Sequence, residues 1–257
     1  MNSLFEKLNN VNIVLLYYNF YMSKRKALDV SGKVVSLKEV VIANIRDAII
    51  TGYFAPGEKL IEKRLTEDMG VSRTILREAL SHLSAEGIVK VIPNKGPVVR
   101  SFGIHDISNL YQIRMALLGL AARQFTQTLT KIKLKNLEKK LEKIKPAHRQ
   151  HDANRLIDSK NNFYACLVDG SENEDLRIIV QSLESQISLT RSLGIKHPKR
   201  SSTRSKVSIE NLQAAFNMIQ AGNHAEAERM IRAETLQAQK EIISLIENIQ
   251  PKNKVSN

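Results

Sequence analysis

Apolar residues recur at helical spacing along most of this chain, and the first clear case lies between residues 36 and 51. Val41, Ile45 and Ile49 are each four residues apart, which places them on one face of an α-helix. Gly52 ends this pattern, and a Pro-Gly pair four residues later is typical of a turn. We therefore expect one amphipathic helix followed by a turn.

Two short helices separated by a tight turn are predicted next. Residues 62–69 form the first helix, and Gly70 closes it. Ser72 is a typical N-cap for the second helix, which we expect to run to about residue 85 and to end before Gly87. The inward face of this second helix consists of Leu76, Leu80 and Leu83.

A β-hairpin is predicted directly after these helices. Two runs rich in β-branched residues, 88–92 and 98–100, flank the segment Pro93-Asn94-Lys95-Gly96. Asn, Lys and Gly between two strands indicate the tip of a hairpin. Together with the three preceding helices, this hairpin predicts a winged helix-turn-helix domain over residues 35–101.

The chain from residue 106 to 248 shows helical periodicity and no convincing strand, so we expect an all-helical bundle there. The first helix is expected to bury one apolar stripe, made of Leu110, Ile113, Leu117, Ala121 and Phe125. Helices are expected near residues 106–128, 132–145, 150–168, 172–195, 203–221 and 223–248. The fold class is therefore mainly α, with an N-terminal winged helix-turn-helix, a linker at residues 102–105 and a C-terminal all-α bundle.

The two ends of the chain lie outside these predicted domains. We expect residues 1–34 to be a flexible extension, with Met22 as a possible true start, and residues 249–257 to be a flexible tail. An apolar segment at residues 11–21 is shorter than the about 20 residues that span a bilayer, and it lacks a signal-peptide cleavage site. Because Cys166 is the single cysteine, no internal disulfide can form. We therefore expect a cytoplasmic protein with no membrane partner.

The charge balance favours a polyanionic partner. The chain carries 39 Lys and Arg against 26 Asp and Glu, a formal net charge of +13, which favours nucleic acid, although such a charge can also serve solubility alone. The excess is greatest at residues 131–160 and 191–206, outside the predicted winged helix. A basic run is usually a solvated face, and it can also attract DNA or an acidic effector.

The second helix of a helix-turn-helix enters the major groove of double-stranded DNA. Arg73 and Arg77 share a helix face that the leucines do not occupy, and arginine can bind guanine edges with two hydrogen bonds. Ser72 and Thr74 lie at the helix N-terminus, where hydroxyl and amide groups suit a phosphate. The alternative is an ordinary surface helix with two solvated arginines.

The run GYFAPGEKLIEKRLTEDMGVSRTILREALSHLSAEGIV resembles the winged-helix domain of the GntR family of transcription regulators. This resemblance implies a homodimer that binds a near-palindromic operator. Many members have an arginine where this chain has Lys63, with Arg64 beside it. The resemblance implies DNA contacts from Lys63, Ser72, Arg73, Thr74 and Arg77, and from the wing tip Asn94, Lys95 and Gly96.

The second half resembles the effector domain of the FadR subfamily, in the stretches LYQIRMALLGLAARQ, FYACLVDGSENEDL and AGNHAEAERMIRAETLQA. The resemblance implies a helical domain that binds a small acid, in many members through a metal held by one Asp and three His. This chain has Lys160, Tyr164, Leu212 and Glu234 at those positions, and none of its six histidines falls there. Because a protonated lysine and a leucine cannot bind a metal, we expect no metal and no cofactor.

An effector pocket without a metal needs another source of positive charge. We expect Arg114, Lys160, Tyr164 and Arg191 to bind the effector, which would then be an anion such as an organic or sugar acid. Two alternatives stay open. Arg114 could pair with an internal carboxylate, and Lys160 could turn into solvent.

These patterns predict a sequence-specific DNA-binding transcription regulator, expected to be a repressor, that a small anionic effector controls. A non-specific nucleoid-type DNA-binding protein is one alternative. An enzyme with an appended helix-turn-helix is another, but the sequence has no P-loop, no G-x-S-x-G and no H-E-x-x-H motif. We therefore expect no catalytic residues.

Overall fold

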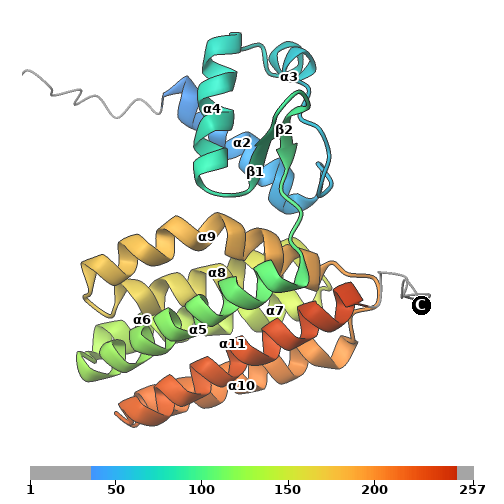
Figure 1. Cartoon of the computed structure of the whole chain (residues 1–257). Helices are drawn as coiled ribbons and strands as arrows, with labels where there is room; N and C mark the ends of the chain where they lie inside the picture. Colours follow the sequence, from blue (N-terminus) through green and yellow to red (C-terminus); the bar gives the residue numbers. More distant parts are fainter. Residues whose placement is uncertain (1–35, 248–257) are drawn as a thin grey trace, which may run out of the picture. The chain divides into compact units, whose positions relative to one another are not determined.

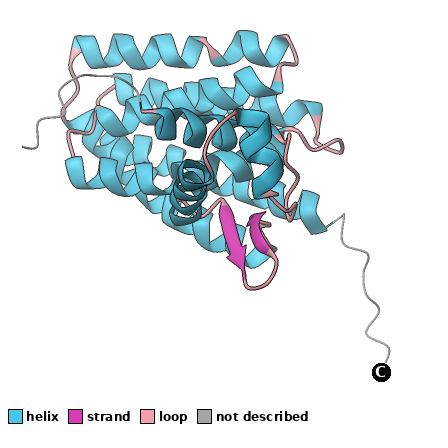
Figure 2. Ribbon diagram, turned by 90° about the horizontal axis from the view of Figure 1, so that it is seen from above, coloured by secondary structure: helices cyan, strands magenta, loops and turns pink. Residues whose placement is uncertain are grey.

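The computed structural model describes residues 36–247 of the chain. The expected N-terminal extension at 1–34, the possible start at Met22 and the tail at 249–257 fall outside these described residues. Within the described part, the protein is mainly helical, with one two-stranded antiparallel sheet (Figures 1 and 2), as the sequence predicts. No helix in this part is both long enough and apolar enough to cross a membrane.

The winged helix-turn-helix contains three helices and a hairpin. Its elements are α2 (Leu37–Thr51), α3 (Glu62–Met69), α4 (Arg73–Ala85), β1 (Val89–Ile92) and β2 (Gly96–Val99). The residues predicted to face inward are buried here, namely Val41, Ile45, Ile49, Leu76, Leu80 and Leu83. The apolar periodicity of α2 and α4 therefore identifies their inner faces correctly.

The turn between α3 and α4 forms for local reasons. Gly70 has a φ of 64°, a left-handed conformation that favours glycine, and its N–H donates to the carbonyl of Thr66. Ser72 is extended and its side chain accepts a hydrogen bond from the backbone N–H of Ile75 at 3.3 Å. One residue closes the first helix and the other opens the second, so α4 begins at a fixed place relative to α3.

The wing is a short hairpin whose strands differ slightly from the predicted ones. β1 pairs with β2 from Val89 opposite Val99 to Ile92 opposite Gly96, so Ile88 and Arg100 lie outside the strands and Gly96 lies inside. The turn is tight because Asn94 has a φ of 62° and the N–H of Lys95 donates to the carbonyl of Ile92 at 3.1 Å. The second strand therefore starts earlier than its β-branched residues suggest.

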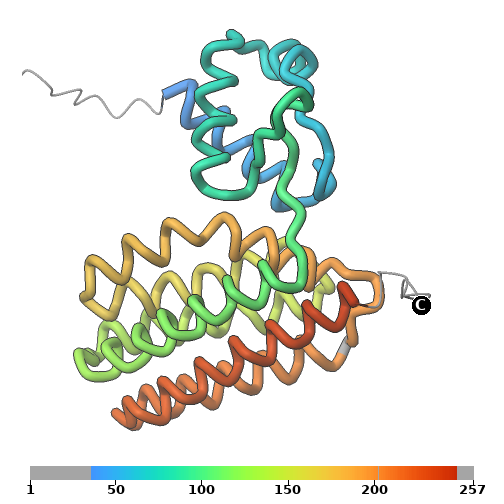
Figure 3. Tube along the Cα trace, viewed as in Figure 1, coloured from blue at the N-terminus to red at the C-terminus, as the bar shows by residue number. Residues whose placement is uncertain are grey.

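The second half of the described chain is a bundle of helices. Its elements are α5 (Ile104–Gln127), α6 (Lys131–Glu142), α7 (Ile144–Arg149), α8 (Ala153–Asp169), α9 (Glu174–Ile195), α10 (Ser202–Gln220) and α11 (His224–Glu247). Helices α5 and α11 lie side by side along much of their length (Figure 3). Phe125, Phe163 and Phe216 are buried in the core of this bundle.

The single helix predicted at residues 132–145 is wrong, because the structure divides this segment into α6 and α7 at Lys143. Pro146 explains the break. In a continuous helix its nitrogen would have to donate to the carbonyl of Glu142, but proline has no N–H and its ring would clash with that carbonyl. In the observed structure Pro146 lies in the first turn of α7, where no N–H is required.

The apolar stripe predicted for the first helix of the bundle is also partly wrong. Leu110, Ala121 and Phe125 are buried as expected, but Ile113 is 50% exposed and Leu117 is only partly buried. The inner face of α5 instead contains Tyr111, Arg114 and Leu118. The apolar spacing identified the inner face of α5 incorrectly for two reasons. A buried arginine lies on the inner face, and a second set of apolar residues lies on the exposed face.

Candidate nucleic-acid interface and effector pocket

The outer face of α4 presents the two arginines expected to read DNA. Arg73 and Arg77 are both exposed, while Leu76 and Leu80 of the same helix are buried. The arginines are one turn apart, so they project from the same side of the helix. Thr74 is also exposed, and Ser72 uses its hydroxyl oxygen to cap the helix.

A carboxylate on α3 orients one of these arginines, which the sequence pattern did not indicate. The Nε of Arg77 donates to Glu62 Oε2 at 2.8 Å, yet the Arg77 side chain remains 68% exposed. Lys63 and Arg64 of α3 are exposed as well, and Arg64 lies 3.4 Å from Asp68. Helix α3 thus presents Lys63 and Arg64 at its surface and also fixes the direction of Arg77.

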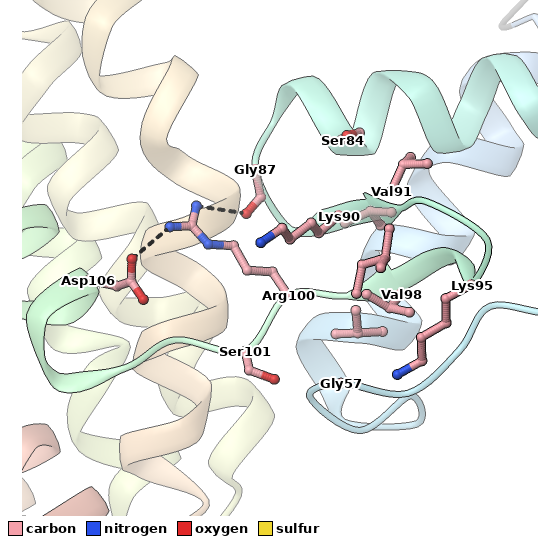
Figure 4. A pocket seen from close by; sticks show the side chains of 13 residues that line it. Gly57, Ser84, Gly87, Lys90, Val91, Lys95, Val98, Arg100, Ser101 and Asp106 are labelled. Carbon is pink, nitrogen blue, oxygen red and sulfur yellow. Dashed lines mark hydrogen bonds and ion pairs between the residues drawn. The ribbon is translucent and has the colours of Figure 1, made fainter.

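The wing carries the other residues expected at DNA. Asn94 and Lys95 are exposed at its tip, and Gly96 opens β2. A groove of about 680 Å³ lies along the wing, and Lys90 and Lys95 are among the residues that line it (Figure 4). Beyond β2, Arg100 donates to the carbonyl of Gly87 at 3.3 Å and to Asp106 at 3.2 Å.

These contacts of Arg100 tie the base of the wing to its neighbours. The Gly87 carbonyl precedes β1, and Asp106 belongs to the first turn of α5. The backbone N–H of Gly103 donates to Asp106 and holds the pKa of that carboxyl below its ordinary value, with Arg100 acting in the same direction. The charged form of Asp106 is therefore favoured, which supports its ion pair with Arg100.

The helical bundle brings together all four residues expected to bind an effector. Arg114, Lys160, Tyr164 and Arg191 are each no more than 7% exposed and line one small cavity of about 30 Å³. The alternative that Lys160 turns into solvent is therefore wrong. Lys160 also belongs to an internal cluster, because its ammonium donates to Ser208 Oγ and lies 3.8 Å from Glu234 Oε1.

Glu234 has hydrogen-bond donors on both of its carboxylate oxygens. Ser208 donates to Oε1, and Asn211 donates to Oε2 at 2.8 Å. Burial lowers the pKa of Lys160 to about 7, against the opposing effect of Glu234. Lys160, Ser208 and Glu234 therefore form a compact buried group, which we call the inner cluster.

The inner cluster is not a set of metal ligands. Of the four positions that the family resemblance indicates, Leu212 is fully buried in the apolar core, and Lys160 places an ammonium group against the one carboxylate, Glu234. Among residues 36–247, no three His, Cys, Asp or Glu side chains converge to hold a metal ion. The residues present do not fit the metal that the resemblance implies.

Two guanidinium groups lie against the ring of Tyr164. Their central carbons are 4.9 Å (Arg114) and 5.4 Å (Arg191) from the ring centroid. Burial, with the nearby charge of Arg114 acting in the same direction, lowers the pKa of Arg191 to about 10. Burial raises the pKa of Tyr164 to about 12, so its hydroxyl stays protonated.

Neither guanidinium has a carboxylate hydrogen-bonded to it within the described part of the chain. Arg114 contacts the rings of Tyr111 and Tyr164. No hydrogen bond or ion pair within residues 36–247 joins it to the internal carboxylate considered for it from the sequence. The Nη1 atom of Arg191 is buried and lacks a hydrogen-bond partner among the same residues. A buried guanidinium in this state is costly unless an anion joins it.

Sequence reasoning missed two arginines in this region. Arg200 and Arg204 belong to the basic run at 191–206, whose expected solvated face is wrong for them, because their side chains are only 10% and 12% exposed. They lie 3.3 and 3.1 Å from Glu241. Glu234 and Glu241 are seven residues apart on α11, a helical spacing that could have indicated a shared partner.

A capped recognition helix with a basic outer face, a wing and a separate helical bundle with a charged interior define a class of protein, the winged-helix DNA-binding regulators. Comparison with known proteins gives the family. Residues 37–99 match "Bacterial regulatory proteins, gntR family", and residues 109–235 match the FCD domain. The chain belongs to the gntR family, and it is a DNA-binding transcriptional regulator with an effector-binding FCD domain.

Relatives of this chain carry regulator names. The HTH-type transcriptional regulator YdhC of Bacillus subtilis is 30% identical over 62% of this chain and 71% of its own length. The regulator McbR of Escherichia coli is 28% identical over 59% of this chain and 68% of its own. The repressor RspR of Escherichia coli is 24% identical over 60% of this chain and 67% of its own.

Solved structures share the fold. The E. coli McbR/YncC structure has a TM-score of 0.72 at 22% identity and covers 84% of this chain and all of its own. A GntR regulator from Rhodococcus sp. RHA1 has a TM-score of 0.67 at 22% identity, over 80% of this chain and 97% of its own. The arrangement of a winged helix and a helical domain is therefore common to these proteins.

Proposed function

We propose that this regulator binds a near-palindromic operator as a homodimer, acts as a repressor and releases DNA when a small anionic effector binds the helical domain. The observation that carries the DNA-binding part is the outer face of α4, where exposed Arg73 and Arg77 lie on a helix whose other face is buried. Glu62 supports this role because it directs Arg77 while leaving it exposed. The wing residues Asn94 and Lys95 are accessible for a second contact with the duplex.

A second copy of the chain is proposed to bind the outer face of α5. Ile113 is 50% and Leu120 is 37% exposed, and Leu117 lies partly buried between them. These residues are spaced by four and three positions, so they form one apolar stripe on the helix. An exposed apolar stripe is typical of an interface, and a two-fold dimer would present two recognition helices to two half-sites.

The effector is proposed to be an anion bound without a metal. An anion is supported because Arg114 and Arg191 are buried without hydrogen bonds to carboxylates in the described structure. A metal is not supported, because Glu234, the one carboxylate of the inner cluster, already accepts hydrogen bonds on both oxygens. Metal analysis of untagged protein should find no stoichiometric zinc, nickel or manganese, and a chelator should leave the melting temperature unchanged. One tightly held metal ion per chain would contradict the proposal.

Control of DNA binding by the effector requires a connection between the effector site and the DNA-binding domain. Arg191 at the effector site is followed on α9 by Ser192, whose hydroxyl donates to the carbonyl of Ile50 in α2 at 2.6 Å. On the same helix, Ser185 donates to Glu86 at the end of α4. A ligand that shifts α9 at Arg191 would therefore act on α2 and α4 of the DNA-binding domain.

Selection from a random duplex library with the purified full chain tests the proposed function. We expect the enriched sequences to share an interrupted inverted repeat with half-sites about one helical turn apart or closer. Duplexes without a common motif would instead support a nucleoid-type protein. An enzyme with an appended DNA-binding domain has less support, because the relatives found are named as transcriptional regulators. Repression is tested by placing the selected duplex over a promoter in a reporter.

A further inference from the structure

A second, larger pocket lies beside the inner cavity of the helical bundle. It has a volume of about 370 Å³ and is lined by residues of α5, α8 and α9. This volume is within the range of about 300–1,000 Å³ that is typical of small-molecule sites. Arg114, Tyr164 and Arg191 line both spaces, so the Tyr164 ring and its two guanidinium groups form a partition between them.

The inner cavity is too small to be the main ligand site. Its volume of about 30 Å³ exceeds only modestly the about 10–15 Å³ needed for one water. Arg200 and Arg204 form ion pairs with Glu234 and Glu241, although three of their buried nitrogens have no hydrogen bond among the described residues, and Lys160 donates to Ser208 beside Glu234. The space next to it, which we call the outer pocket, is about twelve times larger.

At the inner end of the outer pocket, a buried guanidinium nitrogen has no hydrogen-bond acceptor among the described residues. Arg191 is 94% buried, from its 6% exposure, and its Nη1 atom has no hydrogen-bond partner within residues 36–247. Arg114 and Arg191 line the pocket together with Asp169 and Glu184, whereas a third cation, Arg177, is already paired with Glu174. A carboxylate on a ligand would supply the acceptor that Arg191 Nη1 lacks.

The walls of the outer pocket specify the rest of the ligand. Leu118, Val168, Val180 and Ile187 give it an apolar surface. Asn161 also lines it; the Nδ2 group donates to Ser188 at 2.7 Å, while the buried Oδ1 atom has no hydrogen-bond partner among the described residues. That oxygen can accept a hydrogen bond from a hydroxyl or amine.

We propose that the outer pocket binds a monocarboxylic acid with a largely apolar body and one hydrogen-bond donor. Its carboxylate would bind Arg191 and Arg114, its body would contact the apolar walls, and its donor would reach Asn161 Oδ1. This inference rests on the proposed effector control, and it moves the ligand from the position of the family's metal to the space between α8 and α9. The inner cluster then serves as a fixed support behind the partition.

Two substitutions at the rim and two at buried residues separate the two spaces. Gln181 is an exposed residue of α9 that lines the outer pocket, so Gln181→Trp should obstruct it. Ser182 is its exposed neighbour and is not among the lining residues, so Ser182→Trp is the matched control. Arg191→Gln removes the proposed carboxylate partner, and Lys160→Met alters the inner cluster.

The test measures melting temperature and calorimetric binding of the full chain with millimolar benzoate, mandelate, phenyllactate and 2-hydroxy-4-methylpentanoate. Mandelamide, succinate and inorganic phosphate are the comparison ligands. We expect at least one hydroxy acid to stabilise wild type, Ser182→Trp and Lys160→Met. Gln181→Trp and Arg191→Gln should each weaken its binding about tenfold or more, a loss of about 1.4 kcal/mol.

Several results would overturn the inference. Binding that survives Gln181→Trp and is lost in Lys160→Met would place the ligand in the inner cavity. Stabilisation by succinate or phosphate but by no monocarboxylate would exclude a monocarboxylic acid as the ligand. The absence of stabilisation by all of these compounds would exclude it as well. Binding of the selected duplex is measured for every variant without ligand, so intact DNA binding beside failed acid binding refutes this inference and leaves the DNA-binding function standing.

Discussion

Arg73 and Arg77 are the residues from which the account of DNA binding begins. Both are exposed on α4, and the family resemblance also places them at DNA. If each binds one base or phosphate, Arg73→Ala and Arg77→Ala should each cost about 1–3 kcal/mol of binding free energy on the selected duplex. Fluorescence anisotropy at fixed salt measures this loss.

Arg229→Ala is the matched control for these two variants. Arg229 is an exposed arginine that pairs with Glu226 in the same helix. Both residues belong to α11, which lies far along the chain from α4. We expect its replacement to leave duplex affinity unchanged. If Arg73→Ala and Arg77→Ala behave like this control, then α4 is not the recognition helix.

Lys160 gives the protein a specific dependence of stability on pH. Burial lowers its pKa from 10.5 to about 7 in the folded state, so between these values the unfolded chain binds more protons than the folded one. The unfolding free energy contributed by this group therefore rises with pH across that window, and below about pH 7 the cost of burying the charge is fully present.

Urea denaturation at about pH 7 and about pH 9.5 checks this behaviour. Relative to Lys160→Met, wild type should gain stability at the higher pH, while the exposed Lys240→Met variant should follow wild type at both. Parallel pH dependence in wild type and Lys160→Met would mean that Lys160 keeps an ordinary pKa in the folded protein.

The exposure of single residues was predictable where local periodicity decides it, and not where distant helices do. In α4, the spacing of residues alone assigns the leucines to the buried face and the arginines to the exposed face. By contrast, Arg200 and Arg204 lie in a run without acidic residues, and their burial depends on Glu241, which is distant in sequence. Sequence reasoning did place Arg114, Lys160, Tyr164 and Arg191 in one pocket, but only through the family resemblance.

At the scale of elements, the junction after α8 depends on a close approach of backbone and ring. Gly170 follows α8 with an ordinary φ of −73°, but a Cβ added there would overlap the ring of Phe125, which is only 1% exposed. We expect Gly170→Ala to lower the free energy of unfolding by about 1–3 kcal/mol through overpacking. Chemical denaturation measures this change.

Gly103→Ala is the corresponding control at the start of α5. A Cβ at Gly103 would lie 3.5 Å from Asp106 Oδ2, an ordinary contact, and its φ of −79° suits any residue. This variant should change stability much less than Gly170→Ala. Equal stability of both variants would show that Phe125 moves freely and that the junction is not tightly packed.

Element boundaries were predictable where a cap or breaker marks them. Gly70 and Ser72 located the turn between α3 and α4, whereas the break between α6 and α7 was missed although Pro146 was visible in the sequence. The error came from following the apolar spacing through Lys143. The predicted helix stopped directly before Pro146, but a proline also disrupts the turn that precedes it, because it lacks a backbone donor and its ring clashes with the carbonyl four residues earlier.

At the scale of the whole molecule, the exposed stripe on α5 tests the proposed dimer. Ile113→Glu places a charge in the stripe, so it should shift the protein toward monomer and weaken duplex binding, because one half-site contact is lost. Analytical ultracentrifugation measures the first effect. Ile132→Glu is the control, since Ile132 on α6 is 75% exposed and lies outside the stripe; a dimer unaffected by Ile113→Glu would place the interface elsewhere.

The central claim is that this protein reads a DNA sequence rather than DNA in general, although its net charge of +13 would attract any duplex. The most direct test is the ratio of full-chain affinities for the selected duplex and for a shuffled duplex of the same composition at one salt concentration. A specific regulator should show a ratio of about 10³ or more. A ratio near one would contradict the account and identify a non-specific DNA-binding protein.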